Sequence, residues 1–234
     1  QDKSYRKNQY FFIDEAFRNG TDIEGDNGIS EILPSFYPLS DDGKHFIGPL
    51  VVSEIEVFKS VGTDVGAGAF FGDGHVNPNN TALFEEDKES TYFQRLVRNV
   101  DYSVAADLGF IRLTTPLETG KLLAVSYNLN KREESDVFQT VGDLTSTLID
   151  TTDSTTTQFG TVENPLQLKL ICPSNPNPSH ATWDLSFKNV YFLGTTNISD
   201  EGFNLDILYK HGSASNNDRH ENGTKYQAFA WRNR

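Results

Sequence analysis

Residues 91–130 read TYFQRLVRNVDYSVAADLGFIRLTTPLETGKLLAVSYNLN and carry the clearest structural signal in the chain. Short runs of β-branched and aromatic residues are separated by turns that contain Gly109 or Gly120. Alternate positions of the last run would place four side chains on one face: Leu123, Val125, Tyr127 and Leu129. A period of two indicates strands, and short connections indicate antiparallel pairing. The stretch therefore predicts a β-meander.

The segments before this meander predict one more strand and one short helix. Residues 51–60, VVSEIEVFKS, also have a period of two. One face of that strand would carry three apolar side chains: Val51, Ile55 and Val57. Nearer the N-terminus, apolar residues recur at helical spacing before Gly20: Phe12, Ile13, Ala16 and Phe17. This spacing predicts a short helix over residues 4–18.

After the meander, residues 143–162 are rich in Thr, Ser and Asp and have no periodicity, as in a loop or linker. We therefore expect three parts: a helix and meander module over 1–142, the linker, and a C-terminal β module over 163–234. Three strands are expected in the last module, within residues 163–172, 183–194 and 203–210. The predicted fold class is mainly β, with antiparallel β-sandwich or meander modules and one or two short helices.

The strand expected at 183–194, WDLSFKNVYFLG, alternates only as far as Lys188. The break at Lys188 predicts a β-bulge that re-aims the strand. Five side chains would then pack inward: Trp183, Leu185, Phe187, Val190 and Phe192. The strand before it carries the single cysteine, Cys172, which alternation places beside Leu170 as a buried apolar residue.

Composition excludes some classes of function. The chain has 234 residues, a net charge of −13 and a pI near 4.7, so it would repel a phosphate backbone. We therefore expect no nucleic-acid partner. No apolar run approaches the roughly 18 residues of a membrane helix. A chain that begins with Gln1 and contains no methionine is expected to be a processed or excised piece.

Chemical motifs are weak. Asp22, Glu24 and Asp26 place carboxylates at alternate positions, as in a calcium loop. Positions six and twelve of that loop would be Asn27 and Leu33, so a solvated acidic turn is favoured over a metal site. The histidines show no metal-ligand spacing, and no nucleophile elbow or phosphate loop occurs.

We therefore expect no catalytic residue, no cofactor and no small-molecule substrate. Three aromatic residues remain as candidates for binding a partner: Trp183, Tyr191 and Trp231. Such residues would suit a protein that binds or scaffolds rather than one that catalyses.

Three stretches resemble, in the same order, the SprA/Sov family, the giant outer-membrane translocon of the type IX secretion system of the Bacteroidota. The first is NQYFFIDEAFRNG with GPLVVSEIEVF, residues 8–20 and 48–58. The second is FQRLVRNVDYSVAADLGFIRLTTPLETGKLLAVSYNL, residues 93–129. The third, residues 164–210, contains LQLKLIC, WDLSFKNVYFLG and FNLDILYK.

The resemblance implies a section of a β-barrel that passes folded cargo across the outer membrane with an accessory barrel and a plug subunit. The family has no enzymatic activity and no cofactor. A chain of this length is too short to enclose a wide pore, which needs about 16 strands or more. We therefore expect a soluble extracellular or periplasmic scaffold, at the outer membrane or cell surface of a Gram-negative bacterium.

Two other hypotheses remain open. The chain could be a β-sandwich binding module of a secreted surface protein, with carbohydrate as one ligand. It could also be a structural surface or filament subunit, in which exposed strand edges join neighbouring copies.

Overall fold

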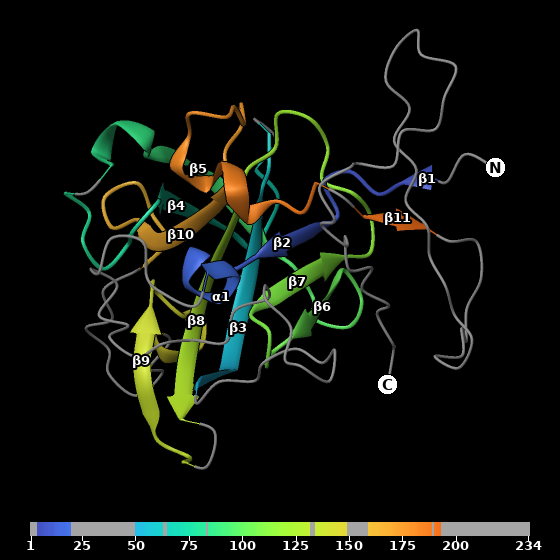
Figure 1. Ribbon diagram of the computed structural model, residues 1–234. Coiled ribbons are helices and arrows are strands. Elements are labelled where there is room, and N and C mark those ends of the chain that lie inside the picture. Colours follow the sequence, from blue (N-terminus) through green and yellow to red (C-terminus); the bar gives the residue numbers. More distant parts are fainter. Residues whose placement is uncertain are drawn as a thin grey trace, which may run out of the picture. The chain divides into compact units, whose positions relative to one another are not determined.

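The computed structural model describes residues 4–19, 50–62, 65–82, 84–131, 134–148, 159–188 and 190–192. Strands dominate these residues and are joined by two short α-helices and two 3-10 helices (Figure 1). The mainly-β class and the short helices expected from the sequence are therefore confirmed. No helix among the described residues is long and apolar enough to cross a membrane.

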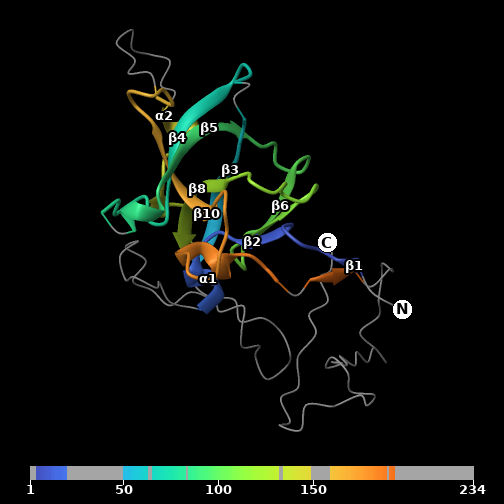
Figure 2. The same ribbon diagram turned by 90° about the horizontal axis from the view of Figure 1, so that it is seen from above.

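Five strands of the larger sheet close into a ring, which Figure 2 views from above. They are β3 (Leu50–Ser60), β4 (Ala69–His75), β5 (Glu89–Arg95), β8 (Leu123–Lys131) and β10 (Leu166–Cys172). Their order is β10-β4-β5-β3-β8, and β10 also pairs with β8, which joins the two ends. β10 runs parallel to β4, whereas the other pairs of the ring are antiparallel. β9 (Val137–Val141) extends the sheet beyond β8.

A smaller sheet has the order β2-β7-β6. Its strands are β2 (Tyr10–Phe12), β6 (Tyr102–Ala105) and β7 (Phe110–Leu113). The remaining elements are α1 (Glu15–Asn19), η1 (Glu85–Asp87), α2 (Thr145–Leu148) and η2 (Ala181–Leu185). Finally, β1 (Ser4–Tyr5) pairs with β11 (Tyr191–Phe192).

Apolar side chains fill the interior of the ring. The buried members of this group are Phe58, Phe93, Leu122, Ala124, Leu166, Leu168 and Leu170. Gly72 and Gly74 on β4 leave room for them, because a Cβ at Gly72 would lie 3.1 Å from Leu168 Cδ1. This close approach explains why a glycine-rich segment forms a strand here.

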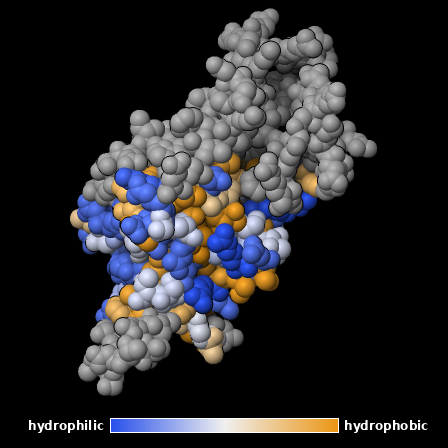
Figure 3. Space-filling view, turned by 90° about the horizontal axis from the view of Figure 1, so that it is seen from below, coloured by the Kyte–Doolittle hydropathy of each residue, from blue (hydrophilic) through white to orange (hydrophobic). Residues whose placement is uncertain are grey.

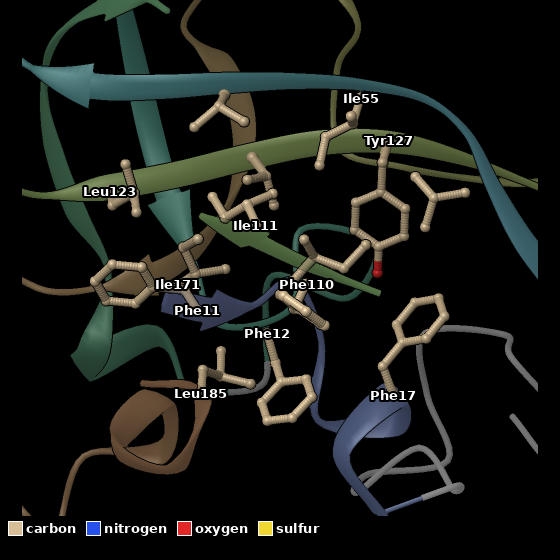
Figure 4. Close-up of a cluster of buried hydrophobic side chains, with 14 of the residues drawn as sticks. Phe11, Phe12, Phe17, Ile55, Phe110, Ile111, Leu123, Tyr127, Ile171 and Leu185 are labelled. Atoms are coloured by element: carbon tan, nitrogen blue, oxygen red, sulfur yellow. The ribbon is translucent and has the colours of Figure 1, made fainter. Parts of the chain in front are cut away.

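A second and larger core includes residues of the smaller sheet, β3 and β8 (Figure 4). Its fully buried members include Phe11, Phe17, Ile111, Leu123, Tyr127 and Leu129. The face predicted for β8 is confirmed, because all four of its side chains lie in this core. Successive residues of β3 therefore face different cores, Val57 the larger one and Phe58 the ring interior.

β-bulges change two of the predicted faces. The register of β3 shifts between Val52 and Glu54, so Val52 joins Ile55 in the larger core and the half-buried Val51 does not. The register of β10 shifts between Leu170 and Cys172. Cys172 is buried as predicted, but in the larger core rather than beside Leu170. A bulge inserts one extra residue and reverses the alternation beyond it.

The helix predicted over residues 4–18 is wrong for most of its length. Tyr10–Phe12 forms β2, which pairs with β7, and only Glu15–Asn19 is helical. Phe11 and Phe12 are both buried, because the larger core covers one face of β2 and Phe187 stacks on Phe12 on the other. An apolar run buried on both faces has no alternation that would distinguish a strand from a helix.

The predicted meander is correct in its strands but wrong in its pairing. Of its neighbours in sequence, β6 and β7 form a hairpin, whereas β5 and β8 both pair with β3. β3 lies between them, so Phe58 pairs with Arg95 of β5 on one edge and with Ala124 of β8 on the other. Short connections therefore did not place all four strands side by side.

The predicted linker at 143–162 falls inside one compact unit, residues 5–191. Its described residues include α2, and β10 beyond it completes the ring with β4 and β8. The described part of the predicted C-terminal module thus belongs to the same core as the meander strands. The strand predicted at 203–210 lies outside the described residues.

The strand predicted at 183–194 is wrong in its first half. Residues 181–185 form η2, where the His180 ring accepts a hydrogen bond from Thr182 N, and among the described residues of this stretch only Tyr191–Phe192 is strand. Leu185 is buried as predicted, while Trp183, Phe187 and Val190 are only half-buried and Phe192 is exposed. The alternation at Trp183 and Leu185 looked like a strand because the 3-10 helix also turns Leu185 into the core.

The Phe17 ring packs directly over Gly109, which has a φ of +61°. A Cβ at Gly109 would lie 1.9 Å from Phe17 Cγ, so Gly109→Ala must displace α1 as well as strain the backbone. We expect the variant to lose about 3 kcal/mol or more of unfolding free energy in urea titrations. Gly120→Ala is the control, because its φ is +82° but nothing lies within 4 Å. It should cost about 1 kcal/mol, and equal losses in both variants would contradict this packing.

Candidate functional site

Among the described residues, the most deeply buried charges belong to Asp14 and Lys169. Lys169 Nζ lies 2.8 Å from Asp14 Oδ2, with side-chain exposures of 6% and 1%. The Tyr127 hydroxyl donates to the same carboxylate oxygen at 3.0 Å, and Lys169 Nζ donates to Val76 O at 3.0 Å. We refer to Asp14, Lys169 and Tyr127 as the ion-pair cluster.

The cluster joins three segments that are distant in sequence. Asp14 lies between β2 and α1, and its Oδ1 accepts a hydrogen bond from Ala16 N at 2.9 Å. Lys169 lies on β10, where it pairs with His75 of β4. Tyr127 extends from β8, and Figure 4 shows its hydroxyl directed away from that strand. Ring strands are thereby connected to the segment between β2 and α1.

A second polar group lies at the end of β4. Asp73 and His75 are buried and lie on one face of β4, and Asn77 is buried two residues beyond the end of that strand. Lys88 Nζ lies 2.8 Å from Asp73 Oδ2, and the Ser90 hydroxyl donates to Asp73 Oδ1 at 2.6 Å. Burial acts to raise the pKa of Asp73, but the hydrogen bonds from Lys88 and Ser90 outweigh it and hold that pKa below its usual value.

His75 and Asn77 each keep one buried polar atom without a hydrogen-bond partner among the described residues: His75 Nδ1 and Asn77 Nδ2. The Asn77 side chain is fixed, because its Oδ1 accepts from the backbone N–H groups of Asn79 and Asn80. Burial lowers the pKa of His75, and the nearby Lys88 cation lowers it further. The imidazole is therefore neutral at pH 7.

Two glutamates of β3 hold α2 and β8. Glu56 accepts hydrogen bonds from the backbone N and hydroxyl of Thr145, each at 2.7 Å, and from Arg95 at 2.7 Å. Glu54 accepts from Ser146 at 2.7 Å and from Asn128 at 3.1 Å. Both oxygens of each carboxylate are thus used to fix neighbouring segments.

The predicted binding aromatics differ in their surroundings. Lys188 Nζ lies 4.4 Å from the centroid of the Trp183 ring, so a cation already occupies one face of the half-buried indole. Tyr191 is 54% exposed, and its ring centroid lies 5.5 Å from that of Tyr5 at an angle of 41°. Tyr191 is therefore open to a partner, while Trp183 is partly covered by its own chain.

The other predicted site residues lie outside the described residues: Asp22, Glu24, Asp26 and Trp231. Among the described residues, no three His, Cys, Asp or Glu side chains are grouped so that they could hold a metal ion. Burial, followed by the charge of Glu89, raises the pKa of the Cys172 thiol to about 12. That thiol therefore stays protonated and weakly nucleophilic.

Several large apolar side chains are exposed: Tyr5, Val65, Val97, Val100, Val137, Phe159, Val162, Tyr191 and Phe192. On the face drawn in Figure 3, hydrophobic side chains form a band among hydrophilic ones.

Sequence reasoning missed Asp14, Lys169 and His75. A signal was present at Lys169, which interrupts the apolar run LQLKLIC, and at Asp14, which interrupts FFIDEAF. A charge inside an apolar run must reach solvent or find an opposite charge. The sequence does not show that these two find each other across 155 residues.

In comparisons with known proteins, the chain matches no family model and no curated protein sequence. The carboxylates, the buried lysine and Tyr127 bind one another and the backbone, which is an arrangement that holds segments together.

Lys169→Met should destabilise the protein strongly, because it leaves the Asp14 carboxylate buried without its cation. We expect a loss of about 3–5 kcal/mol of unfolding free energy in urea titrations. The double variant Asp14→Asn/Lys169→Met should recover most of that loss, because no unpaired charge remains. Lys59→Met is the control, since Lys59 pairs with Glu118 at 3.6 Å with exposures of 34% and 57%. It should change stability by less than about 1 kcal/mol, and equal losses from both single variants would contradict the role of the ion pair.

Stability should fall when pH is lowered below the ordinary histidine pKa of 6.5, because the pKa of His75 is lower in the folded state. Below that pH the unfolded chain binds more protons than the folded one, so the free energy of unfolding decreases. His75→Gln should lose less stability than the unmodified protein between about pH 7 and pH 5. Identical pH profiles in urea titrations would contradict this assignment.

Proposed function

We propose that the chain is a non-enzymatic scaffold section of an outer-membrane protein-translocation machine of the type IX secretion class. Its place would be the outer membrane or cell surface of a Gram-negative bacterium. Its partners would be proteins: the translocated cargo and the accessory barrel and plug subunits. The proposal rests on the resemblance to the SprA/Sov family and on the positions of the residues that carry it.

The observation that supports it most is that these motif residues hold the fold together. In RNVDYSV, Asp101 accepts a hydrogen bond from Val97 N at 2.8 Å, and the buried Tyr102 hydroxyl donates to Ile55 O at 3.1 Å. In FFIDEAF, Asp14 forms the buried ion pair with Lys169 of LQLKLIC. Residues that maintain a fold are expected to recur in a family whose modules are structural.

Motif residues of the third stretch also hold the fold together. In WDLSFKNVYFLG, Leu185 is buried, and the Phe187 ring stacks on Phe12 with a centroid distance of 4.3 Å. Phe187 also lies 5.3 Å from Phe110, so it covers the outer face of the smaller sheet. Motif residues that were open and polar would instead have favoured a binding or catalytic role.

A test of the proposal can be made in the producing bacterium. Codons 5–191 are deleted from the gene that encodes the chain, and Gly109→Ala serves as a milder variant. We expect cargo proteins to disappear from the cell surface and medium and to accumulate in the periplasm, as measured by quantitative proteomics. Peptides from residues 50–188 should fractionate with the outer membrane.

Two outcomes would overturn the proposal. One is unchanged protein export in the deletion strain while the chain is found as a free secreted protein. The other is specific binding to a glycan array that Trp183→Ala or Tyr191→Ala abolishes, which would favour the surface binding module. Lys59→Met provides the matched control in both experiments, because it alters only a surface pair.

A further inference from the structure

The ion pair between Asp14 and Lys169 places an amine against a carboxyl group in a site closed to water. Lys169 Nζ lies 2.8 Å from Asp14 Oδ2, and the two side chains are 6% and 1% exposed. Because Cγ is bonded directly to Oδ2, a small rotation of the lysine side chain brings Nζ within the roughly 3–3.5 Å that separates two atoms before they react. A lysine amine held against a carboxyl carbon in this way is positioned as a nucleophile.

The surrounding structure holds both groups in place. Asp14 lies between Ile13 and Ala16, which are fully buried in the larger core. Lys169 lies on β10, which is paired with a neighbouring strand on each edge. Fixing two reacting groups side by side raises their effective concentration to about 10⁵ M or more. Exclusion of water from the site disfavours the reverse reaction, which is hydrolysis.

The hydrogen bonds of the pair also suit an amide between the two side chains. Asp14 Oδ1 accepts from Ala16 N at 2.9 Å, so the carbonyl oxygen of an amide would keep a partner. Lys169 Nζ donates to Val76 O at 3.0 Å, so the amide N–H would keep one as well. Condensation also replaces two buried charges by a neutral group, which removes the cost of keeping those charges from water. The site therefore favours the amide over the ion pair.

The two oxygens of Asp14 have different donors, which gives them different roles in a condensation. Oδ2 is contacted by Lys169 Nζ and also accepts from the Tyr127 hydroxyl at 3.0 Å. Protons therefore converge on Oδ2, and a hydroxyl donor assists the departure of this oxygen. Oδ1 faces the backbone N–H of Ala16, which stabilises negative charge on that oxygen while Cγ is tetrahedral.

We propose that the folded chain joins Lys169 to Asp14 through an isopeptide bond between Nζ and Cγ. One proton passes from Nζ to Oδ2 along their hydrogen bond, which leaves a neutral amine and a carboxylic acid. Nζ then attacks Cγ, a second proton passes from Nζ to Oδ2, and the bond between Cγ and Oδ2 breaks. Oδ2 leaves as water with both protons, and Nζ keeps one hydrogen. The reaction needs no oxidant and no other reactant.

The bond ties the segment between β2 and α1 to the strand that closes the ring. The chain has a single cysteine, so an intramolecular disulfide cannot supply such a link. The reaction occurs once in each chain, so it is a self-modification rather than an enzymatic activity, and it does not depend on the translocation role. The bond adds stability that Lys169→Met and Asp14→Asn/Lys169→Met both lack, so the difference expected between these two variants stays the same.

The test is mass spectrometry of the full chain, first intact and then after digestion with trypsin in urea. We expect the intact mass to be lower than that of the sequence by one water molecule. Trypsin cannot cleave after an acylated lysine, so residues 8–18 should appear joined to residues 133–188. Without the bond, the digest gives residues 8–18, 133–169 and 170–188 as separate peptides. The joined peptide decides, because a succinimide at an Asp–Gly step also loses water.

Three variants separate the chemistry from the fold, which circular dichroism monitors. Lys169→Arg keeps the buried cation but lacks the amine, so it should show the full mass and no joined peptide. Tyr127→Phe removes the donor to Oδ2. In chains made by cell-free translation and stopped in urea at intervals, its joined peptide should form at least about tenfold more slowly. Lys59→Arg is the matched control, because Lys59 pairs with Glu118 at the surface, and it should react like the unmodified chain.

Two results would overturn the proposal. One is the full mass and separate peptides from the folded, unmodified chain after prolonged incubation at pH 7, which would show that the pair remains ionic. The other is a loss of water that persists in Lys169→Arg without a joined peptide in the unmodified chain, which would place the reaction elsewhere. A joined peptide that forms equally fast in Tyr127→Phe would support the bond but contradict the role of the Tyr127 hydroxyl at Oδ2.

Discussion

β10 pairs with both β4 and β8, and the arrangement of both cores follows from this double pairing. It closes the ring, encloses the side chains of Phe58, Phe93 and Leu168, and fixes Lys169 on the outside. From that position Lys169 reaches Asp14, which leads into α1. One strand thus organises the interior of the ring and also fastens the N-terminal segment to it.

Like the apolar cores, the buried polar groups hold segments together that are distant in the sequence. Glu56 holds α2, Asp73 is bound by Lys88, and Asp14 is bound by Lys169 and Tyr127. Breaking such a buried pair costs far more than the intact pair contributes, because a lone charge remains without water. The arrangement therefore limits which substitutions the fold tolerates.

Site features that depend on one short segment could be predicted from the sequence, whereas those that depend on contacts between distant segments could not. The exposure of Tyr191 and the burial of Leu185 agree with the pattern around them, because each depends on one short segment. The ion-pair cluster could not be predicted, since Asp14, Tyr127 and Lys169 approach one another only through pairing of distant strands.

The mainly-β class, the strands of residues 91–130 and the buried face of β8 were predictable from the sequence, because alternation of apolar residues is a local property. Tertiary structure decided that β3 lies between β5 and β8, that β10 closes the ring, and that Val52 and Cys172 face the larger core. Strand order and the positions of bulges depend on which distant segments can bury their apolar side chains in a common core. That choice depends on the whole chain at once, so no single stretch of sequence contains it.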